Sequence, residues 1–115
     1  MYQYVSRNTF IDTFKEARPD NFNYDGLMVL FDHLEELEQE EGKMRDFDVI
    51  DICCTYSQKT AEELFQDYGY RFEGSDKWHL GQWRDALSEE TPAVLSVYKT
   101  KADQQVLDSL IILDF

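Results

Sequence analysis

One segment, residues 21–42, restricts the fold of this chain more than any other. Its apolar residues recur at spacings of three and four, the period of an α-helix with one buried face: Leu27, Leu30, Phe31, Leu34 and Leu37. The same segment has no Lys or Arg and contains seven acidic residues: Asp25, Asp32, Glu35, Glu36, Glu38, Glu40 and Glu41. The pattern predicts a helix over residues 24–41, ended by Gly42, that buries its leucines and exposes most of its carboxylates.

The last turn of this predicted helix carries Glu40 and Glu41. Negative charge at a helix C-terminus opposes the helix dipole and costs about 0.3 kcal/mol or more per residue, where Lys or Arg would stabilise the helix. The acids therefore lie where local stability disfavours them. We interpret this placement as the sequence evidence that part of the charge serves binding.

Composition and charge limit the class of protein. Of the 115 residues, 43% are hydrophobic and 15% aromatic, so we expect one domain over residues 1–115 that is folded throughout. The 24 acids against 11 bases give a net charge of -13, which would repel phosphates and anionic lipids. Direct binding to nucleic acid or to a membrane is not expected. We expect instead attraction to a basic nucleic-acid-binding protein. The alternative is that the acidity serves only solubility.

The N-terminal sequence shows no signal peptide, and no apolar run is long enough to span a membrane, so the expected location is the cytosol. The adjacent Cys53 and Cys54 cannot form an ordinary disulfide with each other and lack partners for a zinc site. They are interpreted as reduced, small, buried packing residues. The sequence predicts no metal site and no cofactor.

Further elements follow from local signals. We expect a strand at 2–5, a helix at 9–17 that stops before Pro19, and a central strand at 47–55. A capping box of Thr60 and Glu63 predicts a helix with an apolar side of Leu64, Phe65 and Tyr68, closed by Gly69. The remaining elements are a helix capped by Ser75 and Asp76 that carries Trp78, Leu80, Trp83 and Leu87, and strands at 93–99 and 105–113 joined by a hairpin connection at 100–103.

These elements predict an α+β fold in the order β-α-α-β-α-α-β-β. About four mainly antiparallel strands form the sheet, with helices packed on one face.

No catalytic constellation emerges from the residue pattern. His33, with Asp32 beside it and Glu36 nearby, and His79, beside Trp78, are interpreted as ordinary surface histidines rather than a base or metal ligands. Acid pairs are expected by chance in this composition, and calcium loops and phosphate-binding glycine loops are absent from the sequence. Most aromatic residues at 68–83 are expected in the core. One or two exposed beside the acids would add an apolar anchor to a charged binding surface.

Three stretches resemble small acidic proteins of phages and mobile elements: Tyr24-Asp-Gly-Leu27 with its acidic helix, Phe47 to Tyr56 followed by Thr60 to Gly69, and the ending Ile111-Ile-Leu-Asp-Phe115. The resemblance covers residues 1–70 and the extreme C-terminus. The anti-CRISPR proteins are similar in size and acidity. This resemblance implies a stoichiometric inhibitor that occupies the nucleic-acid-binding surface of a CRISPR effector, with no enzymatic residues.

The candidate partner-binding residues are the acids of the long helix, extended by three acids of the capping-box helix: Asp25, Asp32, Glu35, Glu36, Glu40 and Glu41, with Glu62, Glu63 and Asp67. The alternative hypothesis is a non-enzymatic regulatory or interaction protein that forms a homodimer and is acidic only for solubility. It predicts partner binding that is insensitive to salt, whereas charge mimicry predicts a steep loss of affinity as ionic strength rises. An enzyme with a pocket around His33 or His79 is the third hypothesis.

Overall fold

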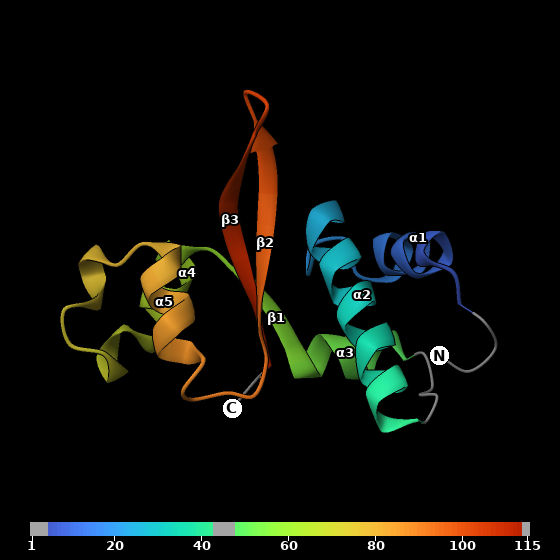
Figure 1. Ribbon diagram of the computed structural model, residues 1–115, viewed down its shortest axis with the longest axis horizontal. Helices are drawn as coiled ribbons and strands as arrows, with labels where there is room; N and C mark the ends of the chain where they lie inside the picture. The colour runs from blue at the N-terminus through green and yellow to red at the C-terminus, as the bar shows by residue number, and fades with distance from the viewer. Residues whose placement is uncertain (1–4, 43–47, 114–115) are drawn as a thin grey trace. The chain divides into compact units, whose positions relative to one another are not determined.

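The computed structural model describes residues 5–42 and 48–113. Within them the chain forms five α-helices, two short 3-10 helices and three β-strands (Figure 1). The α+β class is therefore confirmed. The chain divides into two compact units, Met1–Thr55 (unit 1) and Tyr56–Phe115 (unit 2). The prediction of a single domain over residues 1–115 stays a prediction.

The regular elements of unit 1, among its described residues, are all helices. Helix α1 (Arg7–Ala17) begins two residues before the predicted start, because the Thr9 N–H donates to the Ser6 hydroxyl at 3.2 Å and makes Ser6 the N-cap. Helix α2 (Tyr24–Glu41) has the predicted bounds. It begins at the N-cap Asn23 and ends at Gly42, whose φ of 67° is the left-handed conformation expected of a C-terminal glycine.

Aromatic rings join α1 to α2. The ring centroids of Phe10 and Phe31 lie 5.3 Å apart, and Phe14 meets Phe22 edge to face at 5.6 Å. The buried positions of α2 follow the predicted apolar spacing and include Leu27, Leu30 and Leu34. The hydrophobic pattern of residues 21–42 thus identified the buried face of this helix correctly.

The predicted strand at 47–55 is wrong for the residues that the structure describes. Helix α3 (Val49–Thr55) forms there instead, and Phe47 lies outside the described residues. The Asp51 N–H donates to the Asp48 carboxylate at 3.2 Å, and the Ile52 N–H donates to the Asp48 carbonyl at 3.1 Å. Capping by Asp48, burial of Ile52 and contact with α1 outweigh the strand preference of this β-branched run.

Unit 2 contains a three-stranded antiparallel sheet in the order β1-β3-β2. Strand β1 (Tyr56–Lys59) directly follows α3, and β2 (Val94–Lys101) and β3 (Gln104–Leu113) form the C-terminal hairpin. In this register Tyr56 faces Leu113 and Val94 faces Ile112. The described residues therefore do not show the predicted four strands. The strand expected at 2–5 lies, apart from Val5, outside them.

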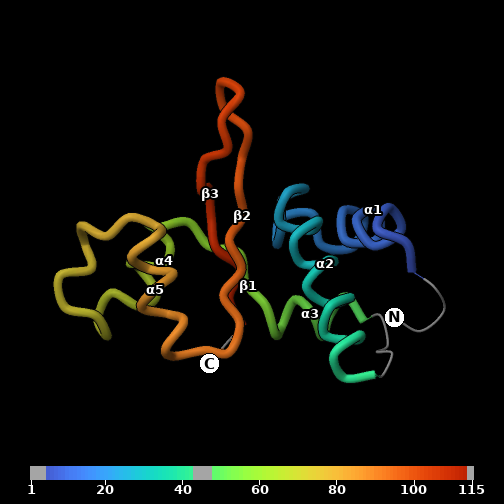
Figure 2. Tube along the Cα trace, viewed as in Figure 1, coloured from blue at the N-terminus to red at the C-terminus, as the bar shows by residue number. Residues whose placement is uncertain are grey.

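The predicted hairpin forms with a shorter connection. Ala102 and Asp103 have φ values of 51° and 63°, so two successive residues take the left-handed conformation of a tight two-residue turn. Pairing of β2 with β3 continues to Lys101 and Gln104, whereas β1 pairs only with the C-terminal part of β3. The two-stranded ribbon continues past β1 (Figure 2). We call its exposed outer part, residues 98–106, the arm.

The helices of unit 2 share one hydrophobic cluster with one face of the sheet. Helix α4 (Ala61–Tyr68) has the predicted Thr60–Glu63 capping box and leads into η1 (Gly69–Arg71) and η2 (Ser75–Lys77), followed by α5 (Leu80–Leu87). Leu64 of α4 and Trp83 and Leu87 of α5 pack with Leu110 and Ile112 of β3. In unit 2, α4 and α5 thus pack on one face of the three-stranded sheet.

The N-cap of α5 differs from the predicted one. Ser75 and Asp76 form η2, and His79 caps α5 instead. The Gln82 N–H donates to His79 Nδ1 at 3.4 Å, while the His79 N–H donates to Gln82 Oε1 at 3.0 Å. Histidine is outside the residue types preferred at this position, so this cap could not be predicted from N-cap preferences.

The His79→Asp variant should be more stable than the wild type. Aspartate is a preferred N-cap, and its charge lies at the positive end of the helix dipole, so we expect the free energy of unfolding to rise by about 0.5–1 kcal/mol. Urea denaturation followed by circular dichroism measures this change. A matched Gln82→Ala variant should lower stability, and a destabilised His79→Asp protein would contradict the assigned cap.

Candidate protein-binding surface

Four carboxylates lie on one face of α2. Asp25, Asp32, Glu36 and Glu40 are separated by seven, four and four residues, spacings that place side chains on the same side of a helix. All four are exposed, and they lie opposite the face that buries Leu27, Leu30 and Leu34. We call these four residues the acidic stripe.

The other acids of α2 lie elsewhere on the helix. Glu35 is half-buried beside the stripe, and Glu41 shares the side of Leu34 and Leu37 but is exposed, one turn beyond Leu37. Glu38 is buried with an exposed fraction of 7%. The structure therefore brings together four of the six α2 residues predicted to bind a partner and separates Glu35 and Glu41 from them.

The four carboxylates of the stripe differ in their local charge environment. Asp32 accepts a 2.7 Å hydrogen bond from Arg7, whose guanidinium also lies 5.9 Å from the Phe31 ring centroid, so a nearby positive charge offsets this carboxylate. Asp25 lies in the first helical turn, where the dipole favours it. Glu36 and Glu40 repel each other across one turn, and the last turn has no basic residue.

The acids predicted on α4 have different roles. The Glu63 carboxylate accepts the Thr60 N–H at 3.0 Å and completes the capping box, and Asp67 forms an ion pair with Lys59. Burial lowers the pKa of Lys59, but the hydrogen bond and charge of Asp67 raise it more, and the net pKa lies above its ordinary value. Glu62 is exposed. Two of these three carboxylates thus stabilise unit 2 itself.

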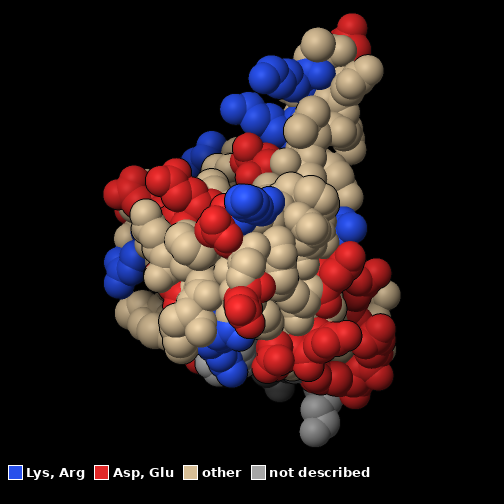
Figure 3. Space-filling model, turned by 90° about the vertical axis from the view of Figure 1, so that its left-hand side faces the viewer, with Lys and Arg blue, Asp and Glu red and all other residues tan. Residues whose placement is uncertain are grey.

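Basic residues are placed on the arm. Lys99 and Lys101 lie two residues apart in β2. Together with Val106 and Asp108 they line a hollow. Figure 3 shows acidic side chains in patches separated by uncharged surface, with Lys and Arg side chains along the protruding part of the face in view. The arm was missed as a charged feature because two lysines in a strand carry little signal in a sequence.

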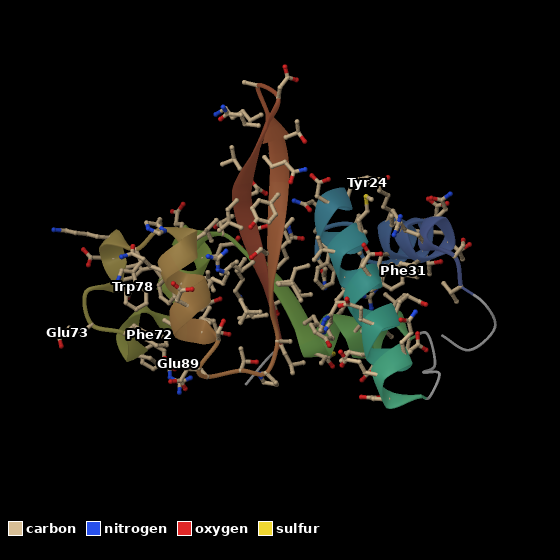
Figure 4. All side chains as sticks on the ribbon, viewed as in Figure 1. Tyr24, Phe31, Phe72, Glu73, Trp78 and Glu89 are labelled. Carbon is tan, nitrogen blue, oxygen red and sulfur yellow. The ribbon has the colours of Figure 1, made fainter. Side chains whose placement is uncertain are left out.

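The aromatic residues at 68–83 separate into a packed group and an exposed one. The rings of Phe72, Trp78 and Trp83 lie 5.0–5.7 Å apart, and Figure 4 shows Phe72 and Trp78 beside α5. Tyr70, by contrast, is 84% exposed. Phe65, predicted on the apolar side of α4, is 43% exposed, so that placement is wrong. Leu64 alone is fully buried on this helix.

The two histidines lie in different units. His33 is half-buried on α2 in unit 1, and His79 caps α5 in unit 2. Over residues 5–42 and 48–113, His, Cys, Asp and Glu form no group of three or more that could hold a metal ion. The geometry around His79 is that of a structural helix cap.

The adjacent cysteines differ in exposure. Cys54 is exposed on α3 and Cys53 is half-buried, so the interpretation of both as buried packing residues is wrong for Cys54. Burial raises the pKa of the Cys53 thiol, and this effect exceeds the opposing effects of a hydrogen bond with Asn21 and the charge of Arg18.

Iodoacetamide should therefore modify Cys54 before Cys53. The thiolate is the reacting species, and Cys53 combines a smaller thiolate fraction with less access to the reagent. Fragment-ion mass spectrometry after limited alkylation at mildly alkaline pH distinguishes the two positions. A Cys54→Ser variant should react more slowly than a Cys53→Ser variant; equal rates would be inconsistent with the different environments of the two thiols.

Comparison of the chain with protein-family models, curated proteins and solved structures gives no match. Among the described residues, no helix combines the length and the apolar character needed to cross a membrane. Arguments about function therefore depend on the surface chemistry of the chain itself.

Proposed function

We propose that this chain is a non-enzymatic anti-defence protein of a phage or mobile element that binds a CRISPR effector complex and blocks its nucleic-acid binding. The acidic stripe of α2 is the contact surface, and its carboxylates occupy positions where the effector binds phosphates. The observation that carries this proposal is the exposure of all four stripe residues on one helix face, in a chain with a net charge of -13.

The geometry of the stripe suits a basic groove. Residues four apart on a helix are separated by about 6 Å along its axis, so Asp32, Glu36 and Glu40 form a regular row of negative charges. A groove that binds nucleic acid is lined by Lys and Arg that would pair with such a row. A net charge of -13 also steers the chain toward a positive surface and accelerates the encounter.

Helix energetics support a binding role for the stripe over one in solubility alone. Solubility requires net charge but no particular position for it. Here Glu40 lies in the last turn of α2, which lacks any basic residue, and repels Glu36 one turn earlier. The charges of Glu36 and Glu40 thus destabilise the helix, which is expected of residues kept for a partner.

The test is a pull-down of purified effector complexes with the immobilised full chain, with and without target DNA, at low and high salt. Binding that both target DNA and high salt abolish is the expected result, because the stripe and the DNA would compete for the same cations. Salt-resistant binding would overturn charge mimicry and indicate an apolar interface. Absence of binding to every complex would overturn the effector as partner and favour a regulatory homodimer, which sedimentation velocity would detect.

A further inference from the structure

Two exposed rings lie close together in the sequence at the end of α4. Phe65 is 43% and Tyr70 is 84% exposed, whereas Tyr68 and Phe72, on either side of Tyr70, pack against the core cluster of unit 2. The segment 65–72 thus has two aromatic residues that pack against the core and two that are exposed to solvent. We call the exposed pair with its neighbouring acids Glu62 and Glu73 the ring surface.

The Phe65 ring is held in place by Gly69. A Cβ atom on Gly69 would lie 2.6 Å from Cδ2 and 2.7 Å from Cε2 of Phe65, so the ring packs directly on the glycine backbone. The Gly69 N–H also donates to the Phe65 carbonyl. One side of the ring is therefore supported while the rest stays accessible, and little side-chain freedom remains to be lost when a partner covers it.

Carboxylates flank both rings. Glu62 precedes Phe65 by three residues on α4, so the two side chains are neighbours on the helix surface, and both are exposed. Glu73 follows Tyr70 by three residues and lies at the outer edge of its loop (Figure 4). The nearby Arg71 lies 3.9 Å from Glu90, and Asp67 is paired with Lys59. Phe65 and Tyr70 thus each have an exposed Glu three residues away in the sequence, and the exposed residues between Glu62 and Glu73 also include Glu63, Asp67 and Arg71.

The combination of exposed rings with exposed carboxylates matches the chemistry of single-stranded nucleic acid. A single strand presents negatively charged phosphates together with unstacked base faces, and proteins that bind it combine cations with aromatic or Arg side chains on which the bases stack. A duplex keeps its base faces inside the helix. An imitation of duplex DNA would therefore need carboxylates but no exposed rings.

We propose that the ring surface imitates single-stranded nucleic acid. Phe65 and Tyr70 stack on the base-binding aromatic or Arg side chains of the partner, while Glu62 and Glu73 pair with its phosphate-binding cations. The partner surface is accordingly a single-strand channel of a protein rather than a duplex-binding groove. This inference rests on the proposed function and adds a second contact surface, in unit 2, to the acidic stripe of unit 1.

The test measures dissociation from the effector complex that the wild-type chain retains in the pull-down. Tyr70→Ala should dissociate about ten times faster, which corresponds to about 1.4 kcal/mol, while the salt dependence of binding stays unchanged because no charge is removed. Tyr70→Phe keeps the ring and should dissociate like the wild type. Tyr98→Ala is the matched control, because Tyr98 is another exposed tyrosine of unit 2, at 43% against 84% for Tyr70, but lies in β2 at the start of the arm.

Competition identifies the kind of channel. A single-stranded oligonucleotide should displace the chain more effectively than a duplex with the same number of phosphates. The single-strand inference would be overturned if Tyr70→Ala dissociated at the wild-type rate, or if the duplex competed as well as the single strand. Either result would leave the proposed function intact. A wild-type chain that binds no effector complex would overturn both together, so the two failures are distinguishable.

Discussion

Charge reversal at Glu36 and Glu40 is expected to abolish effector binding while leaving the fold intact. Both carboxylates are exposed and lie one turn apart in the acidic stripe. The Glu36→Lys/Glu40→Lys variant replaces two attractions to a basic groove with two repulsions, and we expect affinity to fall about 100-fold or more, equivalent to about 2.7 kcal/mol. Isothermal titration calorimetry at low salt measures the loss.

The same variant should be at least as stable as the wild type, which separates binding from folding. Lysine in the last turn of α2 interacts favourably with the helix dipole, whereas Glu40 interacts unfavourably with it. The matched control is Asp12→Lys/Glu16→Lys, which reverses two exposed acids one turn apart on α1 and changes the net charge equally. If this control lost as much affinity as the stripe variant, the net charge rather than the stripe would determine binding.

Truncation of Trp83 is the change with the largest expected effect on folding. Its side chain is fully buried and packs with Leu64, Leu87 and Leu110 in the cluster that joins helices and sheet in unit 2. Trp83→Ala should lower the free energy of unfolding by about 3–5 kcal/mol, because it removes a large apolar surface and leaves a cavity. Small domains have a total stability of only about 5–15 kcal/mol, so a large drop in melting temperature should follow.

Trp83→Phe is a sharper companion variant. Among the described residues the buried Trp83 Nε1–H has no hydrogen-bond acceptor, and an unsatisfied buried donor costs about 1–3 kcal/mol. Phenylalanine removes this donor together with part of the ring volume, so the two effects partly cancel and the loss should be well below that of Trp83→Ala. Equal losses for both variants, measured by chemical denaturation, would show that the N–H does find a partner in solution.

The parts of the fold that could be predicted were those specified by local signals. Leucine spacing and Gly42 gave the bounds of α2, and Thr60 with Glu63 gave the start of α4. Residues 49–55 were mistaken for a strand because β-branched residues suit strands, although Asp48 already offered a helix cap. The choice between helix and strand depended on the tertiary burial of Ile52 within unit 1, and a local sequence pattern does not contain that information.

The acidic residues of the candidate site could be predicted from the sequence, but their arrangement and pairing on the surface could not. Periodicity placed Asp25, Asp32, Glu36 and Glu40 on a solvated face, yet it could not show that Arg7 pairs with Asp32 from another helix. It also did not identify Phe65 as exposed, because an aromatic residue beside Leu64 resembles a core position. Pairing and exposure depend on residues distant in the sequence, which local spacing cannot report.

The strand order of unit 2 has a consequence for protein synthesis. Strand β1 pairs with β3 rather than with a neighbour in the sequence, and Tyr56 meets Leu113 near the C-terminal end of the chain. The cluster beneath α4 and α5 likewise needs Leu110 and Ile112. While the ribosome still holds these residues in its exit tunnel, neither the sheet nor its covering helices can complete their packing. Unit 2 can therefore complete its packing only after β3 has left the tunnel, whereas the helices of unit 1, which are synthesised earlier, can pack before that.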